Sequence, residues 1–285
     1  MYCVNSSDKP LRGSAASLRG CPTTASGSRR FRSQNPALFQ ASGFSDHPYM
    51  RWYPPDKEQN PDPTNGLSTS QYTSLGVIGN LTKALDRLQG VYGSSTRFPI
   101  YDTEFGYITA PPKHRSSKYP YISASTAAYY LNWAEYISWR NPRIQSFHQY
   151  LLRDPLPANK ATVWGGFASG LLFYSGRAKP GYDAWRLPIY MPVQSASSGQ
   201  SLEVWGCARP AHFAAVDTGQ PQSVQIAFAP SGASTFQPVA TVPITDPDGY
   251  FDTRVVFPSS GTVILTWVYP SGAAISSRHV HITIH

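Results

Sequence analysis

The strongest constraint on the fold of this chain is a change of hydrophobic pattern between Pro192 and Gly199. Before it, short apolar runs alternate with stretches of helical periodicity, and after it come only short runs with strand-like alternation. Alternating strands and helices indicate parallel strands with crossover helices, whereas many short strands separated by turns indicate a sandwich. The intervening segment is small and polar, as linkers tend to be. We therefore expect an α/β domain over residues 1–192 and an all-β domain over residues 199–285.

The first region contains the longer periodic stretches. Asn80 and Ser123 stand where helix N-caps are expected, and Leu81, Leu85 and Leu88 fall on one helical face. The expected helices are 28–39, 81–91, 124–140 and 181–187, and the expected strands are 98–105 and 144–152. A Pro-rich segment, 50–70, is too long for a simple connection and is predicted to be a functional loop.

The second region is expected to form a small β-sandwich of immunoglobulin-like type. Turn signals at 230–232 and 246–249 separate its apolar runs. Trp205 and Trp267 are expected in the core of this sandwich rather than as platforms for sugars. The expected strands are 202–205, 224–228, 236–242, 250–257, 262–269 and 275–284.

Charge and composition argue against several partners. The formal net charge is +8, but charged residues make up only 14% of the chain, and its one basic cluster, Arg29, Arg30 and Arg32, is typical of a solvated helix face. We therefore do not expect nucleic-acid binding. No run approaches 18 apolar residues, so no membrane-spanning helix is expected.

Neither a cofactor nor a metal is expected, because no His or Cys stands at zinc-like spacing from Cys3 or Cys21. Those two cysteines bracket a polar segment, and whether they form a disulfide stays open. Cys207 would be left over. The first residues show no signal peptide.

Chemistry is suggested at the end of the strand 98–105. Side-chain alternation puts Ile100, Asp102 and Glu104 on one face, and Glu104 would open onto the rim of a parallel barrel, where such folds carry their sites. His47 and Tyr49 end a preceding strand on one face, so that the phenol of Tyr49 can donate a hydrogen bond to the carboxylate and hold it ionised.

These motifs resemble those of the retaining (β/α)₈ TIM-barrel glycoside hydrolases, a clan with cellulase-like and β-xylosidase-like members. Thr103-Glu104-Phe105-Gly106-Tyr107 looks like the nucleophile strand of that clan, and His47-Pro48-Tyr49 like the end of its sixth strand. The segments 149–154 and 170–185 are similar to its eighth strand and its closing Lys-Pro-x-Tyr-x-Ala-Trp segment. The resemblance spans residues 31–187 and implies a partial barrel made of the C-terminal strands and helices.

The same resemblance assigns the expected roles. It implies Glu104 as the catalytic nucleophile and Tyr49 as its catalytic hydrogen-bond partner, and it implies that His47 and Gln149 line a sugar subsite. We add Tyr150, next to Gln149, and Trp52, in the Pro-rich loop, as expected substrate-binding residues. The expected substrate is an oligo- or polysaccharide.

One element of the clan is missing. Its acid/base is the Glu of an Asn-Glu-Pro motif on the fourth strand, and none of the four glutamates of this chain, Glu58, Glu104, Glu135 and Glu203, lies in that motif. By resemblance the chain begins near the helix after the fifth strand. We therefore expect it to be incomplete alone, with a missing N-terminal barrel half as its partner.

Two functions follow as alternatives. The first is hydrolysis of O-glycosidic bonds by retaining double displacement, with this chain supplying the nucleophile half. The second is a non-catalytic carbohydrate-binding or surface interaction protein built on a barrel remnant and a β-sandwich. The resemblance and the possible disulfide favour an extracellular or cell-surface location.

Overall fold

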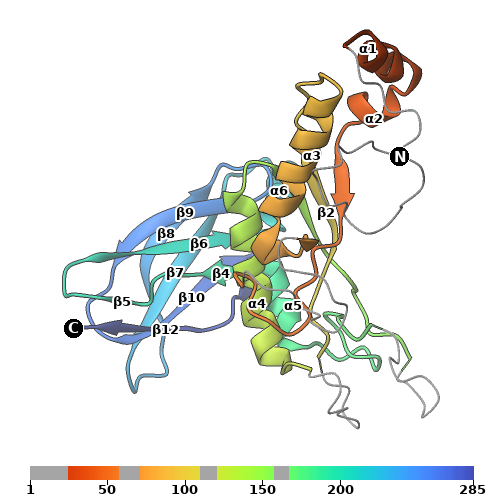
Figure 1. The fold of residues 1–285 in the computed structure, drawn as a ribbon. Coiled ribbons are helices and arrows are strands. Elements are labelled where there is room, and N and C mark those ends of the chain that lie inside the picture. The colour runs from red at the N-terminus through yellow and green to blue at the C-terminus, as the bar shows by residue number, and fades with distance from the viewer. Residues whose placement is uncertain (1–24, 58–70, 110–120, 157–166) are drawn as a thin grey trace. The chain divides into compact units, whose positions relative to one another are not determined.

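The computed structural model describes residues 25–57, 71–109, 121–156 and 167–285 as a mixed α/β structure (Figure 1). The chain divides into two compact units, one formed by Met1–Phe105 with Ile137–Tyr150 and the other by Gly106–Tyr136 with Leu151–His285. Glu58, Cys3 and Cys21 lie outside the described residues. In the described part of the chain, no helix combines the length and the hydropathy needed to span a membrane.

The first unit is built on a three-stranded sheet in the order β1-β2-β3. Its strands are β1 (Phe44–Asp46), β2 (Ile100–Phe105) and β3 (Ile144–Gln149), and its helices are α1 (Ala25–Gln34), α2 (Ala37–Gln40), the 3-10 helix η3 (Leu75–Val77), α3 (Gly79–Val91) and the last turn of α4 (Ala124–Arg140). Both strand pairs are parallel, with Phe44 opposite Ile100 and Ile100 opposite Ile144. The alternation of strand and helix therefore predicted the parallel pairing correctly.

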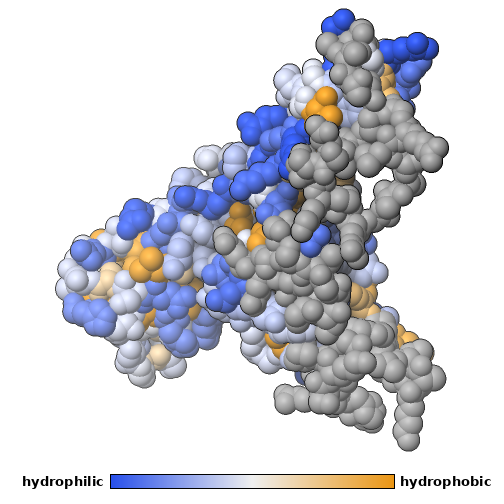
Figure 2. Space-filling model, viewed as in Figure 1, coloured by the Kyte–Doolittle hydropathy of each residue, from blue (hydrophilic) through white to orange (hydrophobic). Residues whose placement is uncertain are grey.

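The helices of this unit follow the expected order with local differences. The expected helix 28–39 is divided into α1 and α2 at Pro36, as expected of a residue that lacks the backbone N–H. Arg29 and Arg30 are exposed on α1, whose surface is largely hydrophilic in Figure 2. The Arg32 side chain instead donates to the Tyr92 carbonyl.

The N-cap expected at Asn80 is wrong. Helix α3 begins at Gly79, after Ile78, and the Asn80 amide donates to the Tyr72 carbonyl at 3.0 Å. Leu81 and Leu85 are buried as expected, but the third buried position is Gln89 rather than Leu88. The Gln89 amide donates to the Leu38 carbonyl at 2.9 Å, which provides this buried polar side chain with a hydrogen bond.

The second unit places two sheets on one core (Figure 1). One has the order β4-β6-β9, and the other has the order β5-β12-β10-β7-β8, with β11 pairing with β10. The strands are β4 (Ile189–Tyr190), β5 (Ser195–Ala196), β6 (Ser201–Cys207), β7 (Gln222–Pro230), β8 (Gln237–Ile244), β9 (Tyr250–Val256), β10 (Gly261–Val268), β11 (Ala274–Ser276) and β12 (Val280–Ile284). The helices are most of α4, α5 (Pro180–Arg186) and α6 (Ala211–Thr218).

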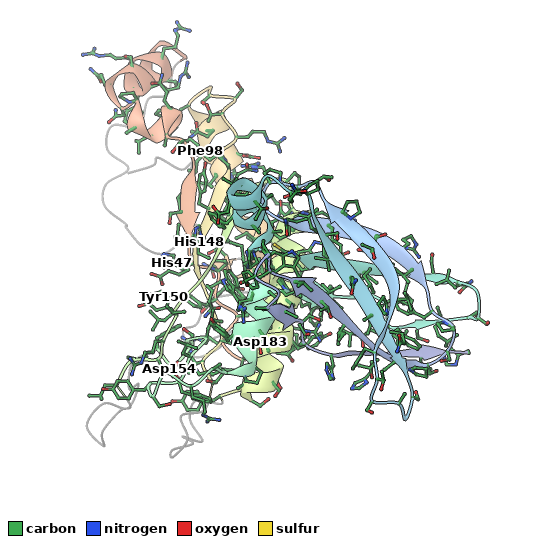
Figure 3. All side chains as sticks on the ribbon, turned by 180° about the vertical axis from the view of Figure 1, so that it is seen from behind. His47, Phe98, His148, Tyr150, Asp154 and Asp183 are labelled. Carbon is green, nitrogen blue, oxygen red and sulfur yellow. The ribbon has the colours of Figure 1, made fainter. Side chains whose placement is uncertain are left out.

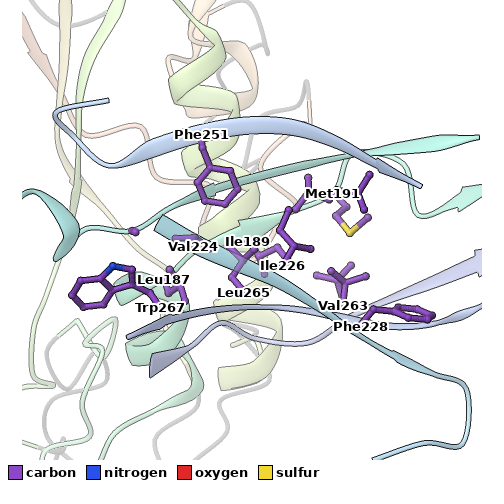
Figure 4. Packing of buried hydrophobic residues seen from close by; sticks show 14 of the residues in the cluster. Leu187, Ile189, Met191, Val224, Ile226, Phe228, Phe251, Val263, Leu265 and Trp267 are labelled. Carbon is purple, nitrogen blue, oxygen red and sulfur yellow. The ribbon is translucent and has the colours of Figure 1, made fainter. Parts of the chain in front are cut away.

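Alternate residues of both sheets fill the core between them. Figure 4 shows side chains from β4, β7, β9 and β10 packed together, and Trp267 is buried among them as predicted. Trp205 is also buried, but it packs outside this cluster, against Tyr136 and Tyr250. The labelled members of this cluster are Leu187, Ile189, Met191, Val224, Ile226, Phe228, Phe251, Val263, Leu265 and Trp267. Burial of such side chains, at about 25 cal/mol per Å² of apolar surface, is the main force that holds the two sheets together.

Two elements of this unit differ from the expectation. The expected strand 275–284 is divided into β11 and β12 at Ser277, whose hydroxyl accepts a hydrogen bond from the Leu265 amide at 2.8 Å. Helix α6 was not predicted, since only strands were expected in this region. It begins after Pro210 and ends at Gly219, which has the left-handed conformation (φ 66°) common at helix C-termini.

Gly261 provides a test of how tightly the two-sheet core is packed. A Cβ atom at this position would overlap the Ala229 carbonyl and the Phe228 ring, so we expect Gly261→Ala to lower the free energy of unfolding by about 1–3 kcal/mol. Gly90→Ala is the matched control, since it adds its methyl group to open space on helix α3 and is expected to be neutral or stabilising by up to about 1 kcal/mol. Urea denaturation measures both. Equal effects would contradict the packing described.

Candidate active site

The candidate site lies where β1 and β2 end. The two strands are parallel, with Asp46 opposite Asp102, so the residues that follow them meet at the same edge of the sheet. His47 and Tyr49 follow β1, and Glu104 is the next-to-last residue of β2. Figure 3 labels His47 near this edge of the first unit, together with His148 and Tyr150 from the neighbouring strand segment.

One carboxylate oxygen of Glu104 lies close to the side chains of both Tyr49 and His47. The Tyr49 hydroxyl donates to Glu104 Oε2 at 3.0 Å, and His47 Nδ1 lies 3.4 Å from the same atom. The side chain of Glu104 is 32% exposed and that of His47 is 50% exposed. The carboxylate is therefore held by a phenol and an imidazole while it remains accessible to a ligand.

Tyr49 is fixed by packing on its ring and by the backbone around it. Its ring lies parallel to that of Phe105, with centroids 6.4 Å apart, and the buried Phe105 ring packs in turn on Phe147 at 5.1 Å. The Leu75 amide donates to the Pro48 carbonyl at 3.0 Å. Burial, followed by the hydrogen bond to Glu104, raises the pKa of the Tyr49 phenol well above its ordinary value, so the phenol stays protonated and remains a donor.

The face expected for Glu104 needs a correction. Ile100 and Asp102 are fully buried, as alternation predicts, but Phe105 is also buried while Glu104 is half-buried. The pairing of β2 with β3 shifts register between Asp102 and Phe105. Such an irregularity re-aims side chains, so Glu104 does not share the burial of Ile100 and Asp102.

Of the other residues expected to bind substrate, Gln149 and Tyr150 lie at the end of β3, and Trp52 lies in the segment after β1. Gln149 is opposite Phe105 in the sheet, and the Tyr150 amide donates to the Phe105 carbonyl at 2.8 Å. Both side chains are half-buried. Trp52 packs instead on Tyr53, with ring centroids 5.4 Å apart. The structure thus brings His47, Tyr49 and Glu104 together and joins Gln149 and Tyr150 to the same strand end, whereas Trp52 belongs to a separate aromatic pair.

The remaining described glutamates have structural partners in the second unit. Glu135 is fully buried and binds Arg209 and the Tyr250 hydroxyl, and Glu203 accepts a hydrogen bond from the Tyr136 hydroxyl at 2.8 Å. Each of these glutamates therefore has a hydrogen-bond partner within the second unit. In the described part of the chain, no group of three His, Cys, Asp or Glu side chains is arranged to hold a metal ion.

Sequence reasoning gave no role to two buried polar features. Lys179 Nζ donates to Asp154 Oδ1 at 2.7 Å and to Thr109 Oγ1 at 3.0 Å, which joins the loop after β3 to the start of α5. Burial lowers the pKa of Lys179, while Asp154 opposes this change. The second feature is the carboxyl pair formed by Asp46 and Asp102, which are distant in sequence. The available signal was the alternation of strand 100–105, which puts Asp102 on the same face as the apolar Ile100.

Together the fold and the site define a mixed α/β protein with a carboxylate, a phenol and an imidazole assembled at the C-terminal edge of a parallel sheet. No family model matches the chain, and no curated protein sequence matches it. Among solved structures, β-glucuronidase 2 of Bacteroides uniformis is 12% identical with a TM-score of 0.34, and the match covers 92% of this chain and 30% of that one.

Other similar structures match a smaller share of the chain. A putative superoxide reductase of Thermotoga maritima is 14% identical with a TM-score of 0.25, over 34% of this chain and 83% of that one. The superoxide reductase (neelaredoxin) of Ignicoccus hospitalis is 11% identical with a TM-score of 0.27, over 35% of this chain and 80% of that one. These similarities are too low to assign the chain to a family or to give it an activity.

Proposed function

We propose that this chain is the nucleophile-bearing part of a retaining O-glycoside hydrolase. The observation that carries the proposal is the hydrogen bond from the Tyr49 hydroxyl to Glu104 Oε2, at 3.0 Å, at the C-terminal edge of a parallel sheet. A half-exposed carboxylate held by a donor is suited to attack an electrophilic carbon. The motifs around Glu104 and Tyr49, which resemble those of the (β/α)₈ glycosidase clan, support the same reaction.

The proposed reaction has two displacements. A Glu104 carboxylate oxygen forms a bond to the anomeric carbon while the glycosidic C–O bond breaks and the leaving oxygen takes a proton from an acid. A water molecule then attacks the same carbon, loses a proton to the conjugate base of that acid, and releases Glu104. The Tyr49 phenol donates its hydrogen bond to the free carboxylate and orients the nucleophile.

The acid/base carboxyl is proposed to come from a missing N-terminal half of the barrel. In a retaining enzyme it must lie about 5–5.5 Å from the nucleophile. Glu135 and Glu203 are already engaged with Arg209 and Tyr136. The parallel sheet β1-β2-β3 is then part of a (β/α)₈ barrel, followed by an immunoglobulin-like β-sandwich, and the proposed location is extracellular or at the cell surface.

Covalent labelling tests the proposed function. The complete protein is first screened on a panel of aryl glycosides and then incubated with the 2-fluoroglycoside of the sugar that it cleaves. We expect time-dependent inactivation and a glycosyl adduct on the peptide that contains Glu104, located by mass spectrometry. Absence of any adduct on an intact, folded protein would contradict a nucleophilic role.

A carbohydrate-binding protein without hydrolytic activity is the second candidate. It is favoured by the engagement of Glu135 and Glu203 elsewhere, which leaves Glu104 without an identified acid/base partner among the described glutamates. In that case the same protein binds oligosaccharides in calorimetry, releases no reducing sugar and takes no label at Glu104.

Tyr49→Phe isolates the contribution of the phenol. The ring that packs on Phe105 is retained, while the donor to Glu104 is lost, so we expect kcat/KM to fall by about tenfold to a thousandfold. Tyr53→Phe, in the neighbouring aromatic pair, serves as the control and is expected to leave kcat/KM unchanged. Steady-state kinetics on an aryl glycoside measure both. An unchanged rate in Tyr49→Phe would show that the hydrogen bond has no role in turnover.

A further inference from the structure

Two carboxyl side chains on the paired strands β1 and β2 precede the candidate-site residues in the chain. Asp46 ends β1 and stands opposite Asp102 in β2. Residues opposite each other in parallel strands point to the same face of the sheet. Asp102 is fully buried, and Asp46 is half-buried. The two side chains therefore share one poorly solvated space.

Each carboxyl has an oxygen whose hydrogen-bonding capacity is unused. Asp46 Oδ2 and Asp102 Oδ1 are buried and accept no hydrogen bond. The other Asp102 oxygen, Oδ2, accepts a hydrogen bond from the Ser138 hydroxyl on α4 at a long 3.5 Å. The backbone amide of His47 donates to the Asp46 carboxyl. Two ionised carboxylates with so few donors would be strongly unfavourable in this environment.

The charged and titratable neighbours offset the charge of the pair only in part, since the charge of His47 lowers the pKa of Asp46 but burial outweighs it. His47 follows Asp46 on the strand end, and its imidazole lies 3.4 Å from Glu104 Oε2. On β3, His148 Nδ1 lies 2.9 Å from the backbone carbonyl of Asp102. The α4 turn contributes the neutral Ser138. None of these described contacts forms an ion pair with the Asp102 carboxyl.

We propose that near neutral pH Asp46 and Asp102 share a single proton in the folded protein, and that this carboxyl pair holds the ends of β1 and β2 in the positions that bring His47 and Tyr49 to Glu104. A proton between the two carboxyls gives one unused oxygen a donor and removes one of the two negative charges. Asp46 directly precedes His47, and Asp102 is two residues before Glu104. Ionisation of both carboxyls adds repulsion between the two strands at this point.

The electrostatics of the folded protein agree with this arrangement. Burial raises the pKa of Asp46 to about 6. Burial, followed by the charge of Asp46, raises the pKa of Asp102 to about 7. Because these pKa values lie above the ordinary value of about 3.9, the folded state binds protons more tightly than the unfolded state. The contribution of the pair to stability is therefore complete below about pH 4 and is lost as the pH rises to about 7.

Carboxyl titration in the complete wild-type protein tests the pair without any catalytic readout. With ¹³C-labelled aspartate, we expect two resonances to titrate well above the others, in coupled steps. The Asp46→Asn and Asp102→Asn variants assign these resonances. Each variant is expected to move the remaining aspartate back toward the ordinary range, because its partner is no longer charged. Two independent titrations in the ordinary range would overturn the proposal.

Urea midpoints at pH 5 and pH 8 give a second readout. From pH 5 to pH 8, we expect the stability of Asp102→Asn to fall less than that of the wild type. Asp46→Asn is expected to show the same reduced fall. The double variant is expected to add little to either single variant, since one shared proton is removed in each case. A pH dependence equal to that of the wild type in both single variants would overturn the proposal.

Asp86→Asn is the matched control. Asp86 binds both terminal nitrogens of Arg143 at 3.0 Å, and this hydrogen bonding lowers its pKa. A lowered pKa contributes stability that is fully present at pH 5 and pH 8 and is lost only at lower pH. The control is therefore expected to lower the midpoint equally at both pH values and to leave the difference between them unchanged.

The positioning role rests on the proposed function and has its own readout. In the active complete protein, Asp102→Asn is expected to shift the alkaline limit of kcat/KM upward, since the second ionisation no longer occurs. An unshifted pH profile would overturn the positioning role. If Asp46 and Asp102 titrate in coupled steps but the protein hydrolyses no glycoside, the proposed function is contradicted and the shared proton is still supported.

Discussion

Glu104→Gln is expected to lower the turnover of the complete protein by a thousandfold or more, on the order of the losses seen when a catalytic nucleophile is removed. The amide has the shape of the carboxylate but is a poor nucleophile. It can still accept the hydrogen bond that the Tyr49 hydroxyl donates at 3.0 Å. The fold should therefore be retained. Single-turnover and steady-state kinetics on an aryl glycoside measure the loss.

A control variant separates this effect from a general loss of charge. Glu203→Gln changes a carboxylate whose described contact is the Tyr136 hydroxyl at 2.8 Å, and its turnover is expected to match that of the wild type. The urea midpoints of both variants should stay close to the wild-type value. Near-normal turnover in Glu104→Gln would refute the assignment of the nucleophile.

Arg209→Leu is expected to produce the largest loss of stability, about 3–5 kcal/mol of unfolding free energy. Glu135 is fully buried, and its Oε1 accepts hydrogen bonds from the Arg209 guanidinium and from the Tyr250 hydroxyl. Arg209 also lies over the Trp185 ring, 3.7 Å from its centroid. Removing the guanidinium leaves a buried carboxylate with one phenolic donor. Urea denaturation at pH 8 measures the loss.

The pH dependence of this effect follows from Glu135. Burial raises its pKa, and Arg209 opposes that change. Without Arg209 the pKa rises further, and the folded state holds the Glu135 proton more tightly than the unfolded state does. Stability then falls as the pH rises, so Arg209→Leu should cost more at pH 8 than at pH 5.

Two further variants complete this test. Arg254→Leu removes an exposed arginine that binds Ser201 and is expected to change stability by no more than about 0.5 kcal/mol. The double variant Arg209→Leu with Glu135→Leu should recover most of the loss, because no charge is left buried. Equal effects of Arg209→Leu and Arg254→Leu would show that the ion pair does not matter.

Local sequence signals predicted much of the secondary structure. The Ser123 hydroxyl accepts a hydrogen bond from the Thr126 amide at 3.0 Å, as expected of an N-cap. Helix α6 escaped prediction because its apolar residues do not follow one face: Ala211 and Ala214 are buried, whereas Phe213 and Val216 are about 70% exposed. Pro210 and Gly219, at the two ends of this helix, are its local sequence signals.

The candidate site was predictable only as a set of residues at strand ends. Alternation and strand order indicated His47, Tyr49 and Glu104, and the resemblance gave them roles that stay proposals. The shift in register between Asp102 and Phe105 has no local sequence signal, because it depends on pairing with β3. The binding role expected of Trp52 stays a prediction, and its ring packs on Tyr53.

The sequence by itself determined most of the segments that become strands and helices, α6 excepted, since periodicity, caps and turn residues act over a few neighbouring positions. It also determined which end of each parallel strand carries polar side chains. Only the tertiary structure decided that Asp46 and Asp102 face each other and that Glu135 meets Arg209. Contacts of this kind join residues far apart in the chain, and their energies depend on burial and on donors that only the folded arrangement supplies.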